Sequence, residues 1–279
     1  MEISIVVPKA FSQFAENENL LLYEHLMDLL QADSPGSGPL SGRKLVAGQG
    51  LDETQISHAW YVGTSKGLKA EFEHWHANRG KQLATKPLVH KHRSENTLIS
   101  TPERSEDGNF VAELVLHEQN ELMLDHLTGQ HVQGMVLTEA CRQMFLAVTE
   151  QFCLQNYPAT KRYFVINTMA VRFQAFAFPL PAQIHYRILD QKLPKPDRMV
   201  IHADMDIYQS GQVVAGMEVK FTVFDDNIIS QREKQLAATA VQRYLGEVRS
   251  LFGPSGDVES IPAFLLAEKA GPRSTQTLQ

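Results

Sequence analysis

One stretch constrains the fold more than any other, because it predicts a long helix that is apolar on nearly its whole circumference. From about Gly134 to Phe152 the side chains are mainly aliphatic, aromatic or sulfur-containing. A helix that is apolar all round is a buried helix. Other elements must therefore surround it, and a curved sheet around the helix would do so.

Three polar side chains interrupt this apolar helix. Glu139, Arg142 and Gln143 are spaced by three and four residues, so a helix places them on one face. A buried carboxylate and a buried guanidinium are costly unless they are paired or used in function. We therefore expect a site for chemistry or a ligand here. The alternatives are a structural ion pair at a dimer interface and a Gln143 that only forms buried hydrogen bonds.

The polar loop before the helix supplies further candidates. His126 and His131 are candidate acid–base or orienting groups, with His126 preferred, although each can instead be structural. Asp125 is expected either to cap the loop or to orient His126. Gly134 stands where the helix begins, so free backbone N–H groups are open to a carbonyl oxygen there, and the missing side chain permits close approach.

The residues around the helix predict strands. Apolar and polar side chains alternate in four stretches: 110–117, 183–189, 199–208 and 213–224. The stretch 163–178 is instead long, apolar and β-branched, and prolines end it. One long helix followed by antiparallel strands is typical of an α+β fold. After these strands, residues 229–250 predict an exposed helix, and the last ten residues are expected to be disordered.

The first 85 residues predict an accessory segment. We expect strands at 3–7, 44–47 and 58–64, and helices at 19–30 and 66–83. His58, His74 and His76 suggest a metal site, but the last two point to different faces of the expected helix. We therefore interpret all three as surface or packing residues and expect no bound metal.

Composition limits the class of protein. With 279 residues, 43% hydrophobic and 21% charged, the chain fits a globular protein with a sizeable core. Its net charge is −6 and its basic residues are scattered, so we expect no nucleic-acid partner. No apolar run is long enough to span a membrane, and no signal peptide is recognisable. Cys141 and Cys153 are too far apart along one helix to form a disulfide, which favours reduced thiols and a cytoplasmic location.

The residues of the central stretch resemble the signature of one family. They read His126-(x)4-His131-Val132-Gln133-Gly134-Met135-(x)3-Glu139-Ala140-x-Arg142-Gln143, which is similar to the A-factor biosynthesis hotdog (AfsA-like) family. Val89-His90-Lys91 and the following Leu98-Ile99-Ser100-Thr101 also resemble that family. The resemblance covers residues 86–228, about half of the chain. Gln133 stands where the family usually has proline.

The resemblance implies a hotdog fold, an antiparallel sheet wrapped around a long central helix, and an acyltransferase. The implied donor is a β-ketoacyl thioester of an acyl carrier protein or CoA. The implied acceptor is a small hydroxyl compound such as dihydroxyacetone phosphate, in the biosynthesis of γ-butyrolactone signals or secondary metabolites. Hotdog sites usually form between two such domains, and the first 85 residues are too short for a second one, so a homodimer is implied. No cofactor is expected.

In this interpretation Glu139 is the general base, Arg142 keeps it ionised or binds a phosphate, and His126 assists. The substrate would contact a second group of residues: Asp125, His131, Gly134 and Gln143. The expected division is an N-terminal accessory segment at 1–85, the hotdog domain at 86–228, and a C-terminal helix with a flexible tail at 229–279.

Two other functions remain open. The first is a dehydratase of 3-hydroxyacyl thioesters that uses His126 and Glu139. These two lie thirteen residues apart, whereas fourteen is usual in hotdog dehydratases, and Asp125 occupies the fourteenth place. The second is a non-catalytic module that binds acyl groups or acts as a scaffold.

Overall fold

The computed structural model describes residues 2–32, 38–78, 82–124, 128–155, 157, 161–195 and 198–252. Asp125 and His126 lie outside the described residues, as does most of the expected C-terminal tail. The chain forms two compact units, Met1–Phe224 and Asp225–Gln279.

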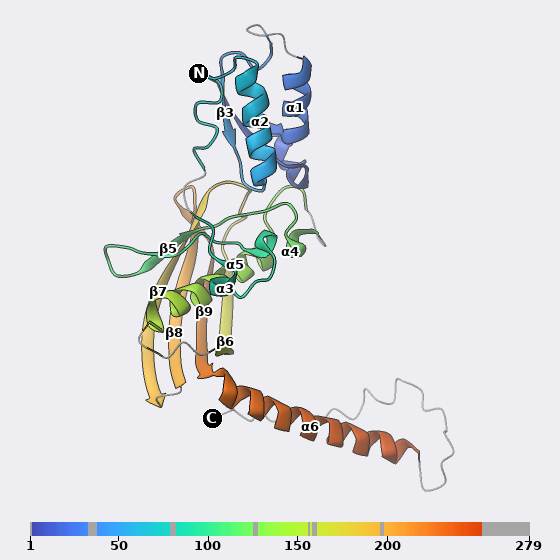
Figure 1. Ribbon diagram of the computed structural model, residues 1–279, viewed down its shortest axis with the longest axis vertical. Coiled ribbons are helices and arrows are strands. Elements are labelled where there is room, and N and C mark those ends of the chain that lie inside the picture. Colours follow the sequence, from blue (N-terminus) through green and yellow to red (C-terminus); the bar gives the residue numbers. More distant parts are fainter. Residues whose placement is uncertain are drawn as a thin grey trace. The chain divides into compact units, whose positions relative to one another are not determined.

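The main body of the first unit is a six-stranded sheet that packs on one long helix, α5 (Gly134–Val148) (Figure 1). The strand order is β4-β5-β7-β8-β9-β6. In chain order the strands are β4 (Glu103–Arg104), β5 (Phe110–Glu113), β6 (Arg162–Phe173), β7 (Ala182–Lys195), β8 (Arg198–Gln209) and β9 (Gln212–Asp225). The antiparallel sheet around a central helix confirms the predicted α+β hotdog fold.

Alternation along the strands determines which face of the sheet packs on the helix. In β8 every second residue is buried, beginning with Met199 and ending with Gln209. The β8–β9 register places partners on the same face, so both strands contribute apolar side chains to one core. Phe221 of β9 stacks on Phe145 of α5 with ring centroids 4.6 Å apart. The two strands are joined at Ser210 and Gly211, whose φ angles of 50° and 81° suit a tight hairpin.

Helix α5 is buried on almost every side, as its composition predicts. Of its residues only Gly134, Met135, Glu139 and Arg142 are not fully buried. A π-helical turn, Thr149–Cys153, continues the helix, so the helical segment ends where the sequence predicts. The polar face at Glu139 and Arg142 is therefore the part of α5 that is left partly uncovered.

The N-terminal residues form a small parallel sheet with the order β2-β1-β3 and a hydrophobic cluster of its own around Trp75. Its elements are β1 (Glu2–Val7), β2 (Leu20–Leu22), α1 (Tyr23–Ala32), β3 (Arg43–Ala47) and α2 (Glu53–Ser65). Short helical turns complete the connections up to α5: η1 (Lys9–Phe11), η2 (Phe14–Glu16), α3 (Lys86–Val89), η3 (Ser94–Asn96) and α4 (Glu121–Leu124).

Three predictions for this segment were wrong in part or in whole. Residues 20–22 pair with β1 as a strand, and the helix expected from residue 19 begins only at Tyr23. Residues 58–64 lie in helix α2, which begins at a capping box formed by Asp52 and Gln55. The helix expected at 66–83 is instead a series of turns over the described residues 66–78.

The second unit contains helix α6 (Asp226–Leu251), which agrees with the exposed helix predicted at 229–250. Asp225 caps it by accepting a hydrogen bond from the Asn227 N–H, and Ile229 is its one buried residue. Among the described helices, none combines the length and the apolarity that crossing a membrane requires.

Candidate active site

Glu139 lies at the centre of a charged cluster on the partly uncovered face of α5. Its Oε1 accepts hydrogen bonds from Lys91 Nζ at 2.7 Å, Arg142 Nη2 at 2.9 Å and Gln143 Nε2 at 3.1 Å. Its Oε2 accepts a hydrogen bond from Arg142 Nε at 2.7 Å. The Glu139 side chain is 14% exposed, against 23% for Lys91 and 30% for Arg142. One carboxylate is thus held between two cations at the surface of the core.

The cations come from different parts of the chain. Arg142 is one helical turn beyond Glu139, so the helix itself brings the two together. Lys91 follows α3, whose C-cap residue His90 has the left-handed conformation with a φ of 53°. This reversal ends the short helix just before Lys91. His90 also contacts Glu150 of the π-helical turn, with 3.0 Å between Nε2 and Oε1.

Gln143 positions this cluster. The side chain is fully buried, its Oε1 accepts a hydrogen bond from the Leu98 N–H at 2.8 Å, and its Nε2 donates to the Asn96 carbonyl at 2.8 Å. The same Nε2 donates to Glu139. Gln143 therefore joins α5 to residues 96–98 and fixes the carboxylate of Glu139 from the core side.

Glu139 is ionised at neutral pH. Burial by itself would raise the pKa of this carboxyl group, but the hydrogen bonds from Arg142 and Lys91, with the charge of Arg142, outweigh it. The pKa of Glu139 therefore lies below its ordinary value. With Lys91 and Arg142 both charged, the cluster carries a net charge of about +1. Such a cluster can take up a proton at the carboxylate or attract an anion.

The start of α5 offers backbone donors about 7.5 Å along the axis from Glu139, at 1.5 Å per residue. The residue before the helix, Gln133, makes no side-chain hydrogen bond to cap it. The ring of Phe173 packs against Gly134, where a Cβ atom would approach the ring to 2.8 Å. Glycine is thus favoured at the first helical position, because a side chain there would have to displace the aromatic ring.

His131 lies in the loop just before this helix start. Its ring contacts Phe176, with centroids 4.8 Å apart, and Thr128 Oγ1 accepts a hydrogen bond from its backbone N–H at 3.1 Å. These described contacts of His131 do not involve Glu139. The structure thus brings Glu139, Arg142 and Gln143 together and places His131 and Gly134 at the helix start; Asp125 and His126 lie outside the described residues.

Lys91 is the site residue that the analysis of helical spacing missed. It is 48 residues before Glu139, so no periodic pattern connects them. The signal that could have found it is the Val89-His90-Lys91 segment, which carries part of the family resemblance.

The cysteines are not activated. Burial raises the pKa of Cys141 to about 12 and that of Cys153 to about 11, so both remain protonated thiols at neutral pH. Among the described residues there is also no group of three or more histidine, cysteine and acidic side chains arranged to hold a metal ion.

Comparison with known proteins identifies the central part of the chain. The family model described as the A-factor biosynthesis hotdog domain matches residues 75–225. No curated protein has a matching sequence.

Similar solved structures include a thioesterase from Haemophilus influenzae, with 12% identity over 50% of this chain and 87% of that chain and a TM-score of 0.35. A Bacillus halodurans protein solved with CoA has 17% identity over 63% of this chain and 97% of that chain, with a TM-score of 0.34. The PaaI protein from the phenylacetic acid degradation operon of E. coli has 17% identity over 43% of this chain and 79% of that chain, with a TM-score of 0.31.

Proposed function

Because this chain belongs to the A-factor biosynthesis hotdog family, we propose that it is an enzyme that transfers an acyl group from a thioester to a hydroxyl acceptor. The donor is a β-ketoacyl group on an acyl carrier protein or CoA, and the acceptor is dihydroxyacetone phosphate or a similar small alcohol in a γ-butyrolactone-type or secondary-metabolite pathway. The observation that carries this proposal is the ionised Glu139 held between Lys91 and Arg142.

The proposed reaction needs a base, an oxyanion site and a place for the acceptor. Glu139 takes the proton from the acceptor hydroxyl, whose oxygen attacks the thioester carbonyl. Backbone N–H groups at the start of α5 stabilise the oxyanion. The C–S bond then breaks, and the departing sulfur takes the proton from Glu139. The ester and a free thiol are the products, and Glu139 is again ionised.

Lys91 and Arg142 control when the Glu139 carboxylate becomes a strong enough base. Four hydrogen bonds make its carboxylate a weak base in the free protein. The phosphate group of the acceptor would compete with Glu139 for Lys91 and Arg142, because guanidinium and ammonium groups both bind phosphate well. Glu139 would then lose hydrogen-bond donors, and its affinity for a proton would rise when the acceptor is in place. His126 is proposed as an assisting group, and Asp125 is the residue before it in the sequence.

A homodimer is part of this proposal. Strand β6 is at the edge of the sheet, and residues 166–170 are exposed on both faces of the strand. Ile166 and Met169 are 41% and 44% exposed there. An edge strand with exposed apolar side chains is open to pairing with another strand. Pairing with β6 of a second copy would cover it and bring a second hotdog domain to the site.

The test is direct. Purified protein is incubated with a β-ketoacyl carrier protein and dihydroxyacetone phosphate, and mass spectrometry detects the ester. We expect an ester that depends on the protein, and a rate roughly 100-fold lower in Glu139→Gln. The matched control is Glu106→Gln, which changes an exposed carboxylate in the β4–β5 turn and should leave the rate unchanged.

Failure to form an ester with short, medium and long acyl chains would contradict the transferase proposal. Reversible hydration of an enoyl thioester by the same protein would point to the dehydratase instead. An acyl ligand that co-purifies equally with the wild type and with Glu139→Gln, without turnover of either substrate, would point to a binding module.

A further inference from the structure

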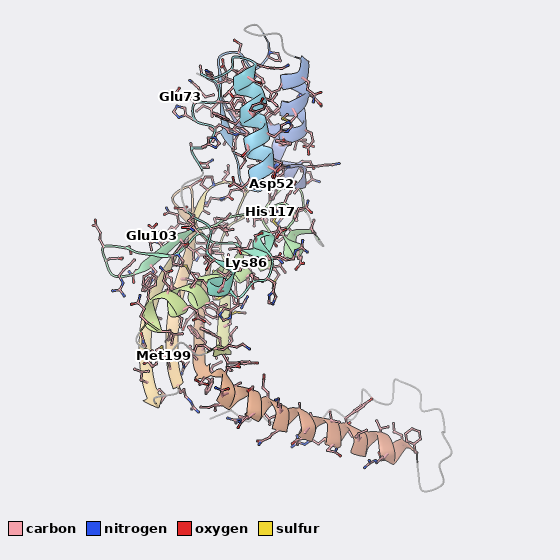
Figure 2. All side chains as sticks on the ribbon, viewed as in Figure 1. Asp52, Glu73, Lys86, Glu103, His117 and Met199 are labelled. Atoms are coloured by element: carbon pink, nitrogen blue, oxygen red, sulfur yellow. The ribbon has the colours of Figure 1, made fainter. Side chains whose placement is uncertain are left out.

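We propose that the chain has a second ligand site, for a small organic amine, in a cavity separate from Glu139. The cavity has a volume of about 880 Å³, the size of sites that hold small organic molecules. The loop after β3 and the start of α2 form one wall, and residues 113–117 form another. Glu139 is not among the residues that line it. Asp52 and His117, labelled in Figure 2, lie on these two walls.

Specific contacts hold the two walls together. Gln49 Nε2 donates to the Leu114 carbonyl at 2.7 Å, and Gln49 Oε1 accepts from the Leu116 N–H at 3.0 Å. The Gly50 carbonyl accepts from the Glu118 N–H at 3.0 Å. Gly50 has a φ of +97° and lies so close to Pro8 that a Cβ atom would come within 2.8 Å of its ring. Hydrogen bonds and close packing thus fix the two walls of the cavity against each other.

The cavity lies where parallel sheets bind ligands. β1 and β3 are parallel neighbours, so their carboxyl ends meet at the same edge. β3 ends at Ala47, and the lining continues through Gly48 into the first turn of α2. In open sheets of this kind, ligands bind in the crevice outside the carboxyl ends of the strands.

One lining residue, Thr97, has a buried hydroxyl group that lacks a hydrogen-bond partner in the described part of the chain. Thr97 is 1% exposed, and its Oγ1 has no hydrogen-bond partner among the described residues. A buried hydroxyl without a partner is destabilising, and native proteins seldom leave one unsatisfied. A polar ligand that enters the cavity and reaches this oxygen would satisfy it.

Charge selects the class of ligand. Among the described lining residues, Asp52, Glu53 and Glu113 carry carboxylates, and none is lysine or arginine. Asp52 and Glu113 are half-buried, and each has one oxygen engaged, by the Gln55 N–H and by Gln183 Nε2 respectively. A hollow lined by charges of one sign attracts the opposite sign. The cavity therefore repels phosphates and carboxylates and favours an ammonium group.

Three probes with the same four-carbon chain and different charges test this site: putrescine, butane-1,4-diol and succinate. Each is titrated into the ¹⁵N-labelled full-length protein, and NMR follows the backbone amide signals of Gly48, Gly50 and Leu116. We expect putrescine to shift these signals in a saturable way, and the diol and succinate to leave them in place at the same concentration.

Variants of the lining residues distinguish putrescine binding in the cavity from non-specific electrostatic binding to an acidic protein. Asp52→Asn keeps a side chain that caps helices well and should weaken putrescine binding about fivefold. Thr97→Val removes the unpartnered hydroxyl; it should weaken binding while leaving the protein at least as stable in thermal unfolding. The control Glu106→Gln removes one exposed carboxylate outside the cavity and should bind putrescine as the wild type does.

Three outcomes would overturn the proposal. The first is that none of the probes shifts the lining signals. The second is stronger binding of succinate than of putrescine. The third is an equal loss of putrescine binding in Glu106→Gln and Asp52→Asn, which would show attraction to net charge alone.

Discussion

At the residue scale, the charged cluster shows what helical spacing can and cannot predict. Glu139, Arg142 and Gln143 follow from a spacing of three and four residues, and the structure places them together. Lys91, which follows α3, completes the cluster through a tertiary contact with α5 that no local sequence pattern contains. Gln143 also makes backbone contacts with residues 96–98 that depend on how the chain returns to the helix.

The depressed pKa of Glu139 predicts how stability changes with pH. A carboxyl group whose pKa is lower in the folded than in the unfolded state stabilises the fold above its unfolded pKa, ordinarily about 4.5 here. That contribution is lost as the pH falls through the lower, folded pKa. The free energy of unfolding should therefore decrease below about pH 4.5, as measured by urea unfolding from pH 7 to pH 3.

Replacing Lys91 tests the origin of this effect. Lys91→Met removes one hydrogen bond to Glu139 and raises its pKa, so we expect a loss of about 1 kcal/mol at pH 7 and a smaller loss on acidification. Lys86→Met, which changes an exposed lysine on the preceding short helix α3, is the matched control and should follow the wild-type curve. Identical pH profiles for Lys91→Met and the wild type would contradict the assigned role of Lys91.

At the scale of elements, periodicity predicted the regular parts of the fold and failed where tertiary contacts dominate. Helix α5 and strands β8 and β9 have long, uniform patterns. The apolar residues of 66–78 have helical spacing, but the backbone of this segment forms hydrogen bonds with strand β3 instead of a regular helix. The Glu71 and Trp75 carbonyls accept hydrogen bonds from the Leu45 and Ala47 N–H groups of β3, and this edge pairing replaces a regular helix.

The start of α5 gives a prediction about packing between elements. Gly134→Ala places a Cβ atom against the ring of Phe173, so we expect the variant to lose about 1 kcal/mol in urea unfolding. In a Phe173→Ala background the ring is absent, and the same change should be neutral or stabilising, because alanine favours a helix more than glycine does. Equal effects of Gly134→Ala in both backgrounds would show that the ring is not the cause.

At the scale of the whole molecule, the exposed edge strand β6 predicts self-association. The wild type should sediment as a dimer in analytical ultracentrifugation. Ile166→Lys places a charge on the edge strand and should shift the protein toward the monomer. Leu236→Lys, at an exposed position on α6, is the matched control and should remain dimeric. A wild type that sediments as a monomer at all concentrations would remove the dimer from the proposed mechanism.

The side chain of Gln49 has a practical consequence for truncated versions of the chain. Its amide lies against residues 114–116 as a peptide group of a neighbouring strand would, donating to one backbone group and accepting from another. Removing residues 1–85 would remove Gln49 and leave the Leu114 carbonyl and the Leu116 N–H without these hydrogen bonds. The shortened protein would then expose unpaired backbone groups that favour aggregation. Aggregation of such a protein would not show that the hotdog domain fails to fold.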